Sequence, residues 1–437
     1  MRSGEAAVAG RRWWVWPVAL LVVGLAAVPL VSYWLTNPAD QRLVDLDVYR
    51  TGGESLLRGL PVYDVITPAP QLLPFTYPPI AAILAVPLAM MSWPAAQWVW
   101  TAGVLLCLTV TVWYAFRELL ARVRRPAWAL PLLFGALAAA CTYLMPIRDQ
   151  VRFGQVDILL VMLCLVDCLA RRPWWPRGML IGLATAVKLT PGVFLIYLLI
   201  TGFGRDALPE QRRTFFMAAF TTVLLTVLPF LVIPHDAADF WFSALLDSGR
   251  VGSNTATTNQ SLRGMLLRLY LPETLTALLW LVLAAAVAWY GFRHARRALL
   301  NGDRMTAVAL TGLMAVLISP VAWIHHLAWS VVALAALAGS ELRLWRAGGP
   351  PTGVRRFVPA WVLLPAGVWL YYVLPIPWWG VSLRAAEIPV LSPVAGRVVQ
   401  DAFGLGAIGL VWLLARRSRQ ACAAAERTAA GEPVSAS

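Results

Sequence analysis

The sequence predicts an all-α polytopic integral membrane protein, on three observations. Of 437 residues, 59% are hydrophobic and only 13% are charged, which is about half the charged share of an average soluble domain. Apolar runs long enough to cross a bilayer recur along the whole chain. The residues able to do chemistry gather in the segments between these runs. A globular core of this length could not bury so much apolar surface, so most of it must face lipid.

The first predicted helix follows Arg11 and Arg12 and runs from Trp13 to about Leu35. This run is too long for the apolar part of a cleavable signal peptide, and it has no small-residue cleavage site. We therefore expect residues 1–12 to be cytoplasmic and the helix to cross outward.

We expect about 10 crossings plus a broken-helix hairpin. The crossings after the first are predicted near 95–116, 127–145, 156–170, 214–234, 273–292, 304–319, 325–341, 357–374 and 399–415. The apolar stretch 178–201 is interrupted by Lys188-Leu189-Thr190-Pro191, and proline disfavours helical geometry at and before its own position. It is predicted as two half-helices that enter from the cytoplasm and return to it. The shorter apolar segment 78–91 is expected at the outer surface.

Charge sets the orientation of these crossings. The formal net charge of +14 would suggest nucleic acid in a soluble protein, but basic residues at helix ends follow the positive-inside rule. The layout puts the arginine clusters inside and leaves outer loops at 36–94, 146–155, 235–272, 320–324 and 375–398. Residues 13–417 then form one transmembrane domain with 36–94 as its first outer loop, and 418–437 form a disordered cytoplasmic tail.

Two carboxylates in the first outer loop, Asp45 and Asp47, suit general-base catalysis. A base close to an acceptor hydroxyl can remove its proton, and a partly apolar setting raises a carboxyl pKa toward working pH. The alternative is that both are solvated loop acids or helix caps.

Aromatic and amide side chains in the outer loops are candidates for binding an acceptor. Tyr77 and Gln155 lie in polar motifs at membrane edges, and Asn259 and Gln260 follow a loop rich in Ser, Thr and Gly. Amides offer paired donors and acceptors to sugar hydroxyls. Alternatively, Tyr77 is an interfacial anchor and the amide pair caps a helix.

Cationic and histidine side chains are candidates for binding a phosphate group. They are Arg148, Arg152, Lys188, Arg263, His325 and His326. Lys188 is the sharpest signal, because it is the chain's one lysine and lies at the apex of the broken hairpin. Charge at membrane depth is expensive and faces a cavity or a partner. The alternative is a structural pair with a buried carboxylate.

No metal site is expected. His325 and His326 are adjacent, and neighbours on a helix diverge by about 100°, which does not favour chelating one ion together. No other spacing is typical of a zinc site, and neither a Walker loop nor a Rossmann glycine motif is present. The paired aspartates leave a divalent metal possible.

Six motifs occur in a characteristic order between about residues 40 and 340. They are Asp45-Leu46-Asp47-Val48-Tyr49, Phe75-Thr76-Tyr77-Pro78-Pro79, Gly154-Gln155-Val156-Asp157, Lys188-Leu189-Thr190-Pro191, Asn259-Gln260-Ser261-Leu262, and Ser319-Pro320 through His325-His326. In this order they resemble the multi-spanning C-type mannosyltransferases of glycosyltransferase family 87, which are found in actinobacterial envelopes.

The resemblance implies a C-type glycosyltransferase fold in the plasma membrane, with both termini cytoplasmic and the catalytic loops outside. It implies mannose transfer from polyprenyl-phosphomannose to phosphatidylinositol mannosides, lipomannan or lipoarabinomannan, with inversion. Asp45 matches the expected base, and Asp47 is then expected to bind acceptor hydroxyls or to tune Asp45. No cofactor is required. The double-aspartate form of this motif, Asp45 with Asp47, resembles the form found in α-1,2-mannosyltransferases that branch or cap the mannan. Asp157 departs from the Asn of relatives, so no sugar contact is carried over there.

Two other functions stay open at this point. A transporter or flippase of a lipid-linked sugar also uses broken helices with a mid-membrane charge, although no internal repeat is visible and the polar motifs share one face. A transferase of the same fold could move another sugar, such as arabinose or glucose.

Overall fold

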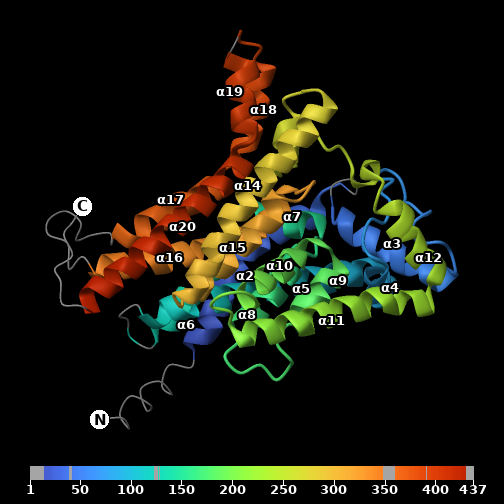
Figure 1. Ribbon diagram of the computed structural model, residues 1–437. Helices are drawn as coiled ribbons and strands as arrows, with labels where there is room; N and C mark the ends of the chain where they lie inside the picture. Colours follow the sequence, from blue (N-terminus) through green and yellow to red (C-terminus); the bar gives the residue numbers. More distant parts are fainter. Residues whose placement is uncertain are drawn as a thin grey trace.

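A computed structural model describes residues 14–38, 42–122, 126, 128–347, 360–389 and 391–429. Within these residues the secondary structure is helical apart from two isolated bridges, Ile66 with Pro74 and Asn259 with Trp323. Figure 1 shows an elongated bundle with α3, α4 and α12 at one end and the far end of α20 at the other, while α18 and α19 project as a pair.

The helices divide into α-helices and short turns of other types. The α-helices are α2 (Val15–Thr36), α3 (Val44–Arg58), α4 (Pro79–Ala89), α5 (Trp93–Arg122), α6 (Ala129–Thr142), α7 (Met145–Phe153), α8 (Asp157–Leu169), α9 (Met179–Val187), α10 (Val193–Gly202), α11 (Pro209–Val232), α12 (Pro234–Asp239), α13 (Leu262–Leu267), α14 (Glu273–Leu300), α15 (Arg304–Leu317), α16 (Ser330–Ala347), α17 (Ala360–Val373), α18 (Ile376–Ala385), α19 (Leu391–Gln400) and α20 (Ala402–Ala429). The short 3₁₀ segments are η2 (Thr190–Gly192), η4 (Ser248–Val251) and η5 (Ile324–Trp329), and η3 (Phe240–Ala244) is a π-helical turn.

The described helices confirm a multi-pass membrane protein. Five are long and apolar enough to cross a bilayer, and the number reaches 8 if each of three bent pairs counts as one span. The helices α2, α11 and α14 leave most of their surface outside the protein core, as lipid-facing helices do. The predicted crossings at 156–170 and 304–319 correspond to the shorter helices α8 and α15, so the number ten stays a prediction.

The broken segment folds back on itself, as predicted. Gly178, just before α9, packs against Thr214 near the start of α11, and Gly202 at the end of α10 packs against Arg212 of the same helix. Both ends of the segment therefore meet the same end of α11. The chain enters and leaves on one side, and Lys188 lies at the apex, where α9 ends.

The core is built around α15 and α16. Every residue from Thr306 to Leu317 is buried, and Gly312 allows the Trp329 ring to lie directly against the backbone of α15. Both helices are rich in alanine and small residues, which lets neighbouring helices approach closely. These buried helices support the η5 turn, which carries the two adjacent histidines.

The tail prediction needs one correction. Residues 418–429, expected to be disordered, continue α20 as helix to Ala429. An ion pair and a hydrogen bond anchor the start of this segment, since Arg417 lies 2.9 Å from Glu341 of α16 and the Ser418 hydroxyl donates to Asp303 at 2.9 Å. Residues 1–12 and 430–437 lie outside the described residues.

Candidate active site

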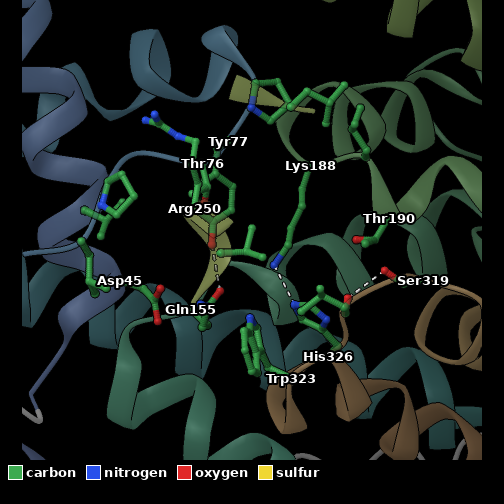
Figure 2. A pocket seen from close by; sticks show the side chains of 18 of the residues that line it. Asp45, Thr76, Tyr77, Gln155, Lys188, Thr190, Arg250, Ser319, Trp323 and His326 are labelled. Atoms are coloured by element: carbon green, nitrogen blue, oxygen red, sulfur yellow. Dashed lines mark hydrogen bonds between the residues drawn. The ribbon is translucent and has the colours of Figure 1, made fainter. Parts of the chain in front are cut away.

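Five of the candidate residues line one cavity of about 290 Å³. They are Asp45, Tyr77, Gln155, Lys188 and His326. They come from the start of α3, the turn before α4, the turn before α8, the hairpin apex and the η5 turn. Figure 2 shows Asp45 on one side of the cavity, Lys188 and His326 on the other, and Gln155 between them. Motifs separated by nearly 300 residues in sequence thus meet at one place.

Asp45 is positioned by the first turn of α3. The backbone N–H of Leu43 donates to the carbonyl of Arg152 at 2.8 Å, which ties the start of α3 to the end of α7. Gly154 follows α7 with φ +69°, and a Cβ there would lie 2.9 Å from the Leu46 side chain, so glycine permits this close approach. The first turn of α3 therefore rests directly on the motif that carries Gln155.

The environment of Asp45 suits a base. Burial raises the pKa of Asp45 from its ordinary 3.8 to about 7, against the lowering effects of a hydrogen bond to Gln155 and the charge of Lys188. A carboxyl group with this pKa changes protonation near neutral pH and can both accept and release a proton there.

A hydrogen-bonded wall of two tyrosines and one amide stands beside Asp45. The Tyr49 and Tyr77 hydroxyls lie 3.0 Å apart, and they lie 3.2 Å and 3.3 Å from Gln155 Oε1. Tyr63 donates to the backbone carbonyl of Tyr77 at 2.8 Å. Burial raises the pKa of Tyr77 to about 12, so the hydroxyl stays protonated and available as a donor. The wall fixes the Gln155 amide beside the carboxylate.

Lys188 forms a buried ion pair and also lines the cavity. Its Nζ donates to Asp157 Oδ1 at 2.8 Å and to His326 Nε2 at 3.1 Å. An ammonium has only donors, so His326 Nε2 must accept. The Lys188 side chain is 14% exposed. The structural alternative is thus correct about the buried carboxylate, yet the lysine also lines the cavity.

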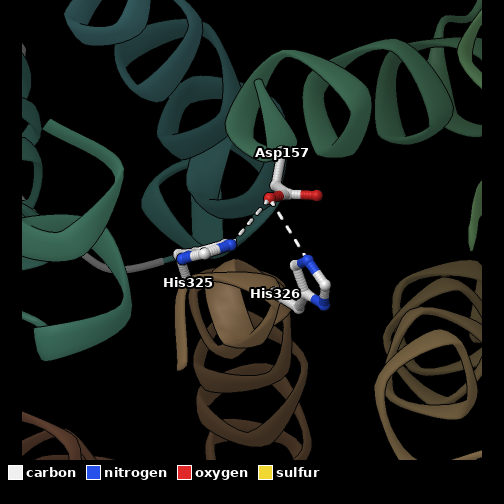
Figure 3. A group of neighbouring side chains, drawn as sticks. All are labelled: Asp157, His325 and His326. Atoms are coloured by element: carbon white, nitrogen blue, oxygen red, sulfur yellow. Dashed lines mark ion pairs between the residues drawn. The ribbon is translucent and has the colours of Figure 1, made fainter. Parts of the chain in front are cut away.

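The two histidines converge on Asp157, contrary to the sequence expectation (Figure 3). Nε2 of His325 and Nε2 of His326 each lie 3.7 Å from Asp157 Oδ2. They belong to a 3₁₀ turn, and their ring centroids are 4.8 Å apart. Ligand atoms of all three residues lie within 4.8 Å of one another, a spacing that could hold a metal ion. The Lys188 ammonium already lies against this group and supplies a positive charge to it.

Asn259 and Gln260 lie outside the cavity lining, which does not support acceptor binding. The Asn259 Oδ1 accepts from the Ala322 N–H at 3.1 Å, and the Gln260 Oε1 accepts from the Gly404 N–H at 2.8 Å. Both side chains are fully buried. Their amides fasten the loop before α13 to the 320–323 turn and to α20, so they hold Trp323 in the lining without lining the cavity themselves.

Four other candidate residues do not line the cavity, and their local contacts or helix positions explain why. Arg263 stacks over Trp280 at 6.0 Å, and Arg152 stacks over Phe153 at 5.1 Å. Arg148 lies on the same short helix as Arg152, and neither lines the cavity. Asp47 lies two residues beyond Asp45 on a helix, so its side chain points to a different face and away from the lining.

The structure adds residues that sequence reasoning did not select. Arg250 of η4 lines the cavity and donates to the backbone carbonyl of Tyr63. Thr76, Ser319 and Trp323 also line the cavity. Trp323 and Ser319 occur within a recognised motif, but a single arginine in a long loop carries no signal that distinguishes it from its neighbours.

A carboxyl group and an ammonium face one cavity of a polytopic helical bundle, an arrangement that suits an integral-membrane group-transfer enzyme. The chain belongs to glycosyltransferase family 87, whose family model matches residues 75–320. It is therefore a glycosyltransferase, which confirms the expected family and excludes the transporter reading.

Curated relatives span most of the chain. A polyprenol-phosphate-mannose-dependent alpha-(1-2)-phosphatidylinositol mannoside mannosyltransferase of Mycolicibacterium smegmatis is 36% identical over 76% of this chain and 78% of its own length. Its namesake from Mycobacterium tuberculosis is 34% identical over 84% and 83%. A M. tuberculosis pentamannoside mannosyltransferase is 31% identical over 83% and 78%. The crystal structure of ArnT from Cupriavidus metallidurans in the apo state aligns over 94% of this chain and 78% of that chain, with 16% identity and a TM-score of 0.36.

Proposed function

We propose that the protein transfers mannose from polyprenyl-phosphomannose to a phosphatidylinositol mannoside or a related mannosylated lipoglycan, forming an α-1,2 linkage with inversion. The activities for which relatives at 36% and 34% identity are named support this donor, acceptor class and linkage. Asp45 acts as the general base, and the donor phosphate binds on the Lys188 side of the cavity.

One observation carries the mechanism: Asp45 and Lys188 face the same cavity from opposite sides (Figure 2). An inverting transfer needs the base on one face of the anomeric carbon and the leaving group on the other. A mannosyl group placed between the two side chains has its acceptor near Asp45 and its phosphate near Lys188.

The chemical step balances within this arrangement. The Asp45 carboxylate takes the proton of an acceptor hydroxyl, whose oxygen forms a bond to the anomeric carbon. The bond from that carbon to the phosphate oxygen breaks, and polyprenyl phosphate leaves with one more negative charge than it had as a diester. Preorganised positive charge beside that oxygen stabilises the transition state.

The residues around the two ends have distinct tasks. Lys188 provides a point charge to the phosphate, and His326 contacts it from the same side. His325 lies behind, against Asp157. Gln155 and Tyr77 orient the acceptor hydroxyl beside Asp45, since both are already held in one hydrogen-bonded wall.

The reaction requires no metal in this proposal. A lipid-phosphate donor is already activated, and the Lys188 ammonium supplies the positive charge where the leaving oxygen develops its own. Membrane lipids surround the enzyme, both termini are cytoplasmic, and the cavity opens on the outer face of the plasma membrane, where the first outer loop contributes Asp45.

The test is transfer of radiolabelled mannose from synthetic polyprenyl-phosphomannose to a phosphatidylinositol mannoside by the purified protein. Parallel reactions use lipid-phosphate arabinose and glucose. Asp45→Asn should abolish transfer, whereas Asp64→Asn should not, because Asp64 is an exposed carboxylate in the segment between α3 and α4. Transfer of another sugar in place of mannose, or full activity of Asp45→Asn, would contradict the proposal.

A further inference from the structure

A second polar cavity, of about 240 Å³, lies at the other end of the bundle. It is enclosed by the end of α5, the end of α8, the turn between α14 and α15, and the later part of α16. Helix α8 connects the two sites: it begins with Asp157 beside Lys188 and ends with Leu169 at the second cavity. Thirteen helical residues span about 20 Å, so the second cavity is separate from the active site.

The lining of this cavity is strongly basic. Five arginines and two carboxylates line it, namely Arg117, Arg122, Arg171, Arg304, Arg343, Glu118 and Asp303. The lining therefore carries a net charge of +3. Positive charges that converge on one cavity repel one another, and an anion bound among them relieves that repulsion.

Most of these arginines lack a close carboxylate. Arg117 donates to the Leu169 carbonyl and stacks 4.3 Å from the Tyr114 ring, and no carboxylate of the described residues forms an ion pair with it. Arg122 and Arg171 are both 3.8 Å from Glu118, which is beyond hydrogen-bond length.

The remaining two arginines differ from each other. Arg304 lies 3.6 Å from Glu210, again a loose pair. Arg343 is the exception, with an ion pair to Asp303 at 2.6 Å. Guanidinium groups without a close carboxylate keep several N–H donors available, and their fork geometry matches phosphate oxygens.

We propose that this cavity binds the phosphate group of an anionic phospholipid. The cavity lies at the C-terminal end of α5, a helix long and apolar enough to cross a bilayer, and basic pockets between such helix ends are suited to lipid headgroups. The bound lipid lies in the leaflet opposite the one that faces the candidate active site. Inorganic phosphate shares the chemistry but lacks the acyl chains that would hold it at this level.

The proposal is tested with the full-length protein in neutral detergent, by native mass spectrometry and thermal unfolding. The probes are phosphatidylglycerol, phosphatidylcholine and inorganic phosphate. The variants are Arg171→Gln/Arg304→Gln and, as a matched control, Arg213→Gln, an exposed arginine of α11 outside the lining. Arg171 and Arg304 are 82% and 50% exposed, so their replacement leaves the fold intact.

Phosphatidylglycerol should bind and raise the unfolding temperature of the parent and of Arg213→Gln, with about tenfold weaker binding by the double variant. Phosphatidylcholine should do neither. An equal response to inorganic phosphate would keep the anion site but overturn the lipid as its ligand. Equal phosphatidylglycerol binding by the parent and the double variant would overturn the site itself. Because mannose transfer is not measured, either outcome is independent of the proposed function.

Discussion

The Lys188 ammonium lies 2.8 Å from the Asp157 carboxylate, with side chains only 14% and 8% exposed. The pair joins the apex of the hairpin to the first residue of α8, and His326 accepts a further hydrogen bond from the same ammonium at 3.1 Å. One cation thus holds two elements of the candidate active site together while it faces the cavity. Its structural role and its proposed catalytic role can be separated by mutation.

Breaking the Lys188–Asp157 pair from one side should destabilise the protein. Asp157→Asn leaves a buried ammonium without its carboxylate, which costs about 3–5 kcal/mol, measured as a fall in thermal unfolding temperature. Asp157→Leu/Lys188→Met removes both charges and should recover most of that stability while transferring no mannose. If the stable double variant stayed active, Lys188 would be structural only.

Activity should depend on pH through Asp45. Because burial raises the pKa of Asp45 to about 7, the carboxyl is neutral below that pH and cannot accept a proton. The value of kcat/KM should therefore rise with pH through about 7 and level off above it. The same shift means that Asp45 favours the folded state most at low pH, an advantage lost as pH rises from 3.8 through 7. A pH profile without a limb near 7 would argue against Asp45 as the base.

Removing the Gln155 amide should raise the pH at which kcat/KM increases. The hydrogen bond from Gln155 lowers the pKa of Asp45, so Gln155→Leu should raise it further and shift the acid limb of kcat/KM to higher pH. Tyr63→Phe serves as the comparison, because Tyr63 donates to a backbone carbonyl and not to the wall of side chains. An unchanged limb in Gln155→Leu would show that the amide does not act on Asp45.

Chelation of divalent metals should leave mannose transfer unchanged. Lys188 already contacts two members of the Asp157–His325–His326 group at 2.8 and 3.1 Å, so positive charge is present without an ion. The check is the transfer rate after dialysis against EDTA, followed by addition of Mn²⁺, Mg²⁺ or Zn²⁺. Loss of activity that one of these ions restores would make the group a metal site.

The hairpin should tolerate no side chain at its contact with α11. A Cβ on Gly182 would lie 2.5 Å from the Thr221 Cβ and 2.6 Å from the Ala218 carbonyl. Gly182→Val should therefore destabilise the protein by about 1–3 kcal/mol and lower activity by displacing Lys188. Gly103→Ala in α5, where nothing lies within 4 Å of the added atom, should do neither.

Composition predicts the long lipid-facing helices well, because a helix that faces lipid must be apolar along its length. The predicted span at 273–292 is nevertheless shorter than α14, which continues to Leu300. The last turns carry Arg293, Arg296 and Arg297, and they stay helical beyond the apolar run. Hydropathy therefore locates a span but does not mark where the helix ends.

The site was only partly predictable for a physical reason. Lys188 and Asp45 stand out because a charge beside or within an apolar run is rare and needs a purpose. The sequence predicts Asn259 and Gln260 as acceptor-binding residues, but they lie outside the cavity lining. An amide that fastens two buried loops has the same local sequence as one that binds a sugar. The convergence of His325 and His326 depends on a 3₁₀ turn, whose geometry no helical spacing rule describes.

The hairpin also has a consequence for how the chain is threaded during synthesis. The start of α9 and the end of α10 both lie against the same end of α11. The hairpin therefore does not change on which side of the membrane any later segment lies. The insertion machinery can place the lysine at the tip of this hairpin without carrying the flanking arginines to the other side of the membrane. Gain or loss of the whole hairpin would preserve the topology of the rest of the protein and remove only the cation at its tip.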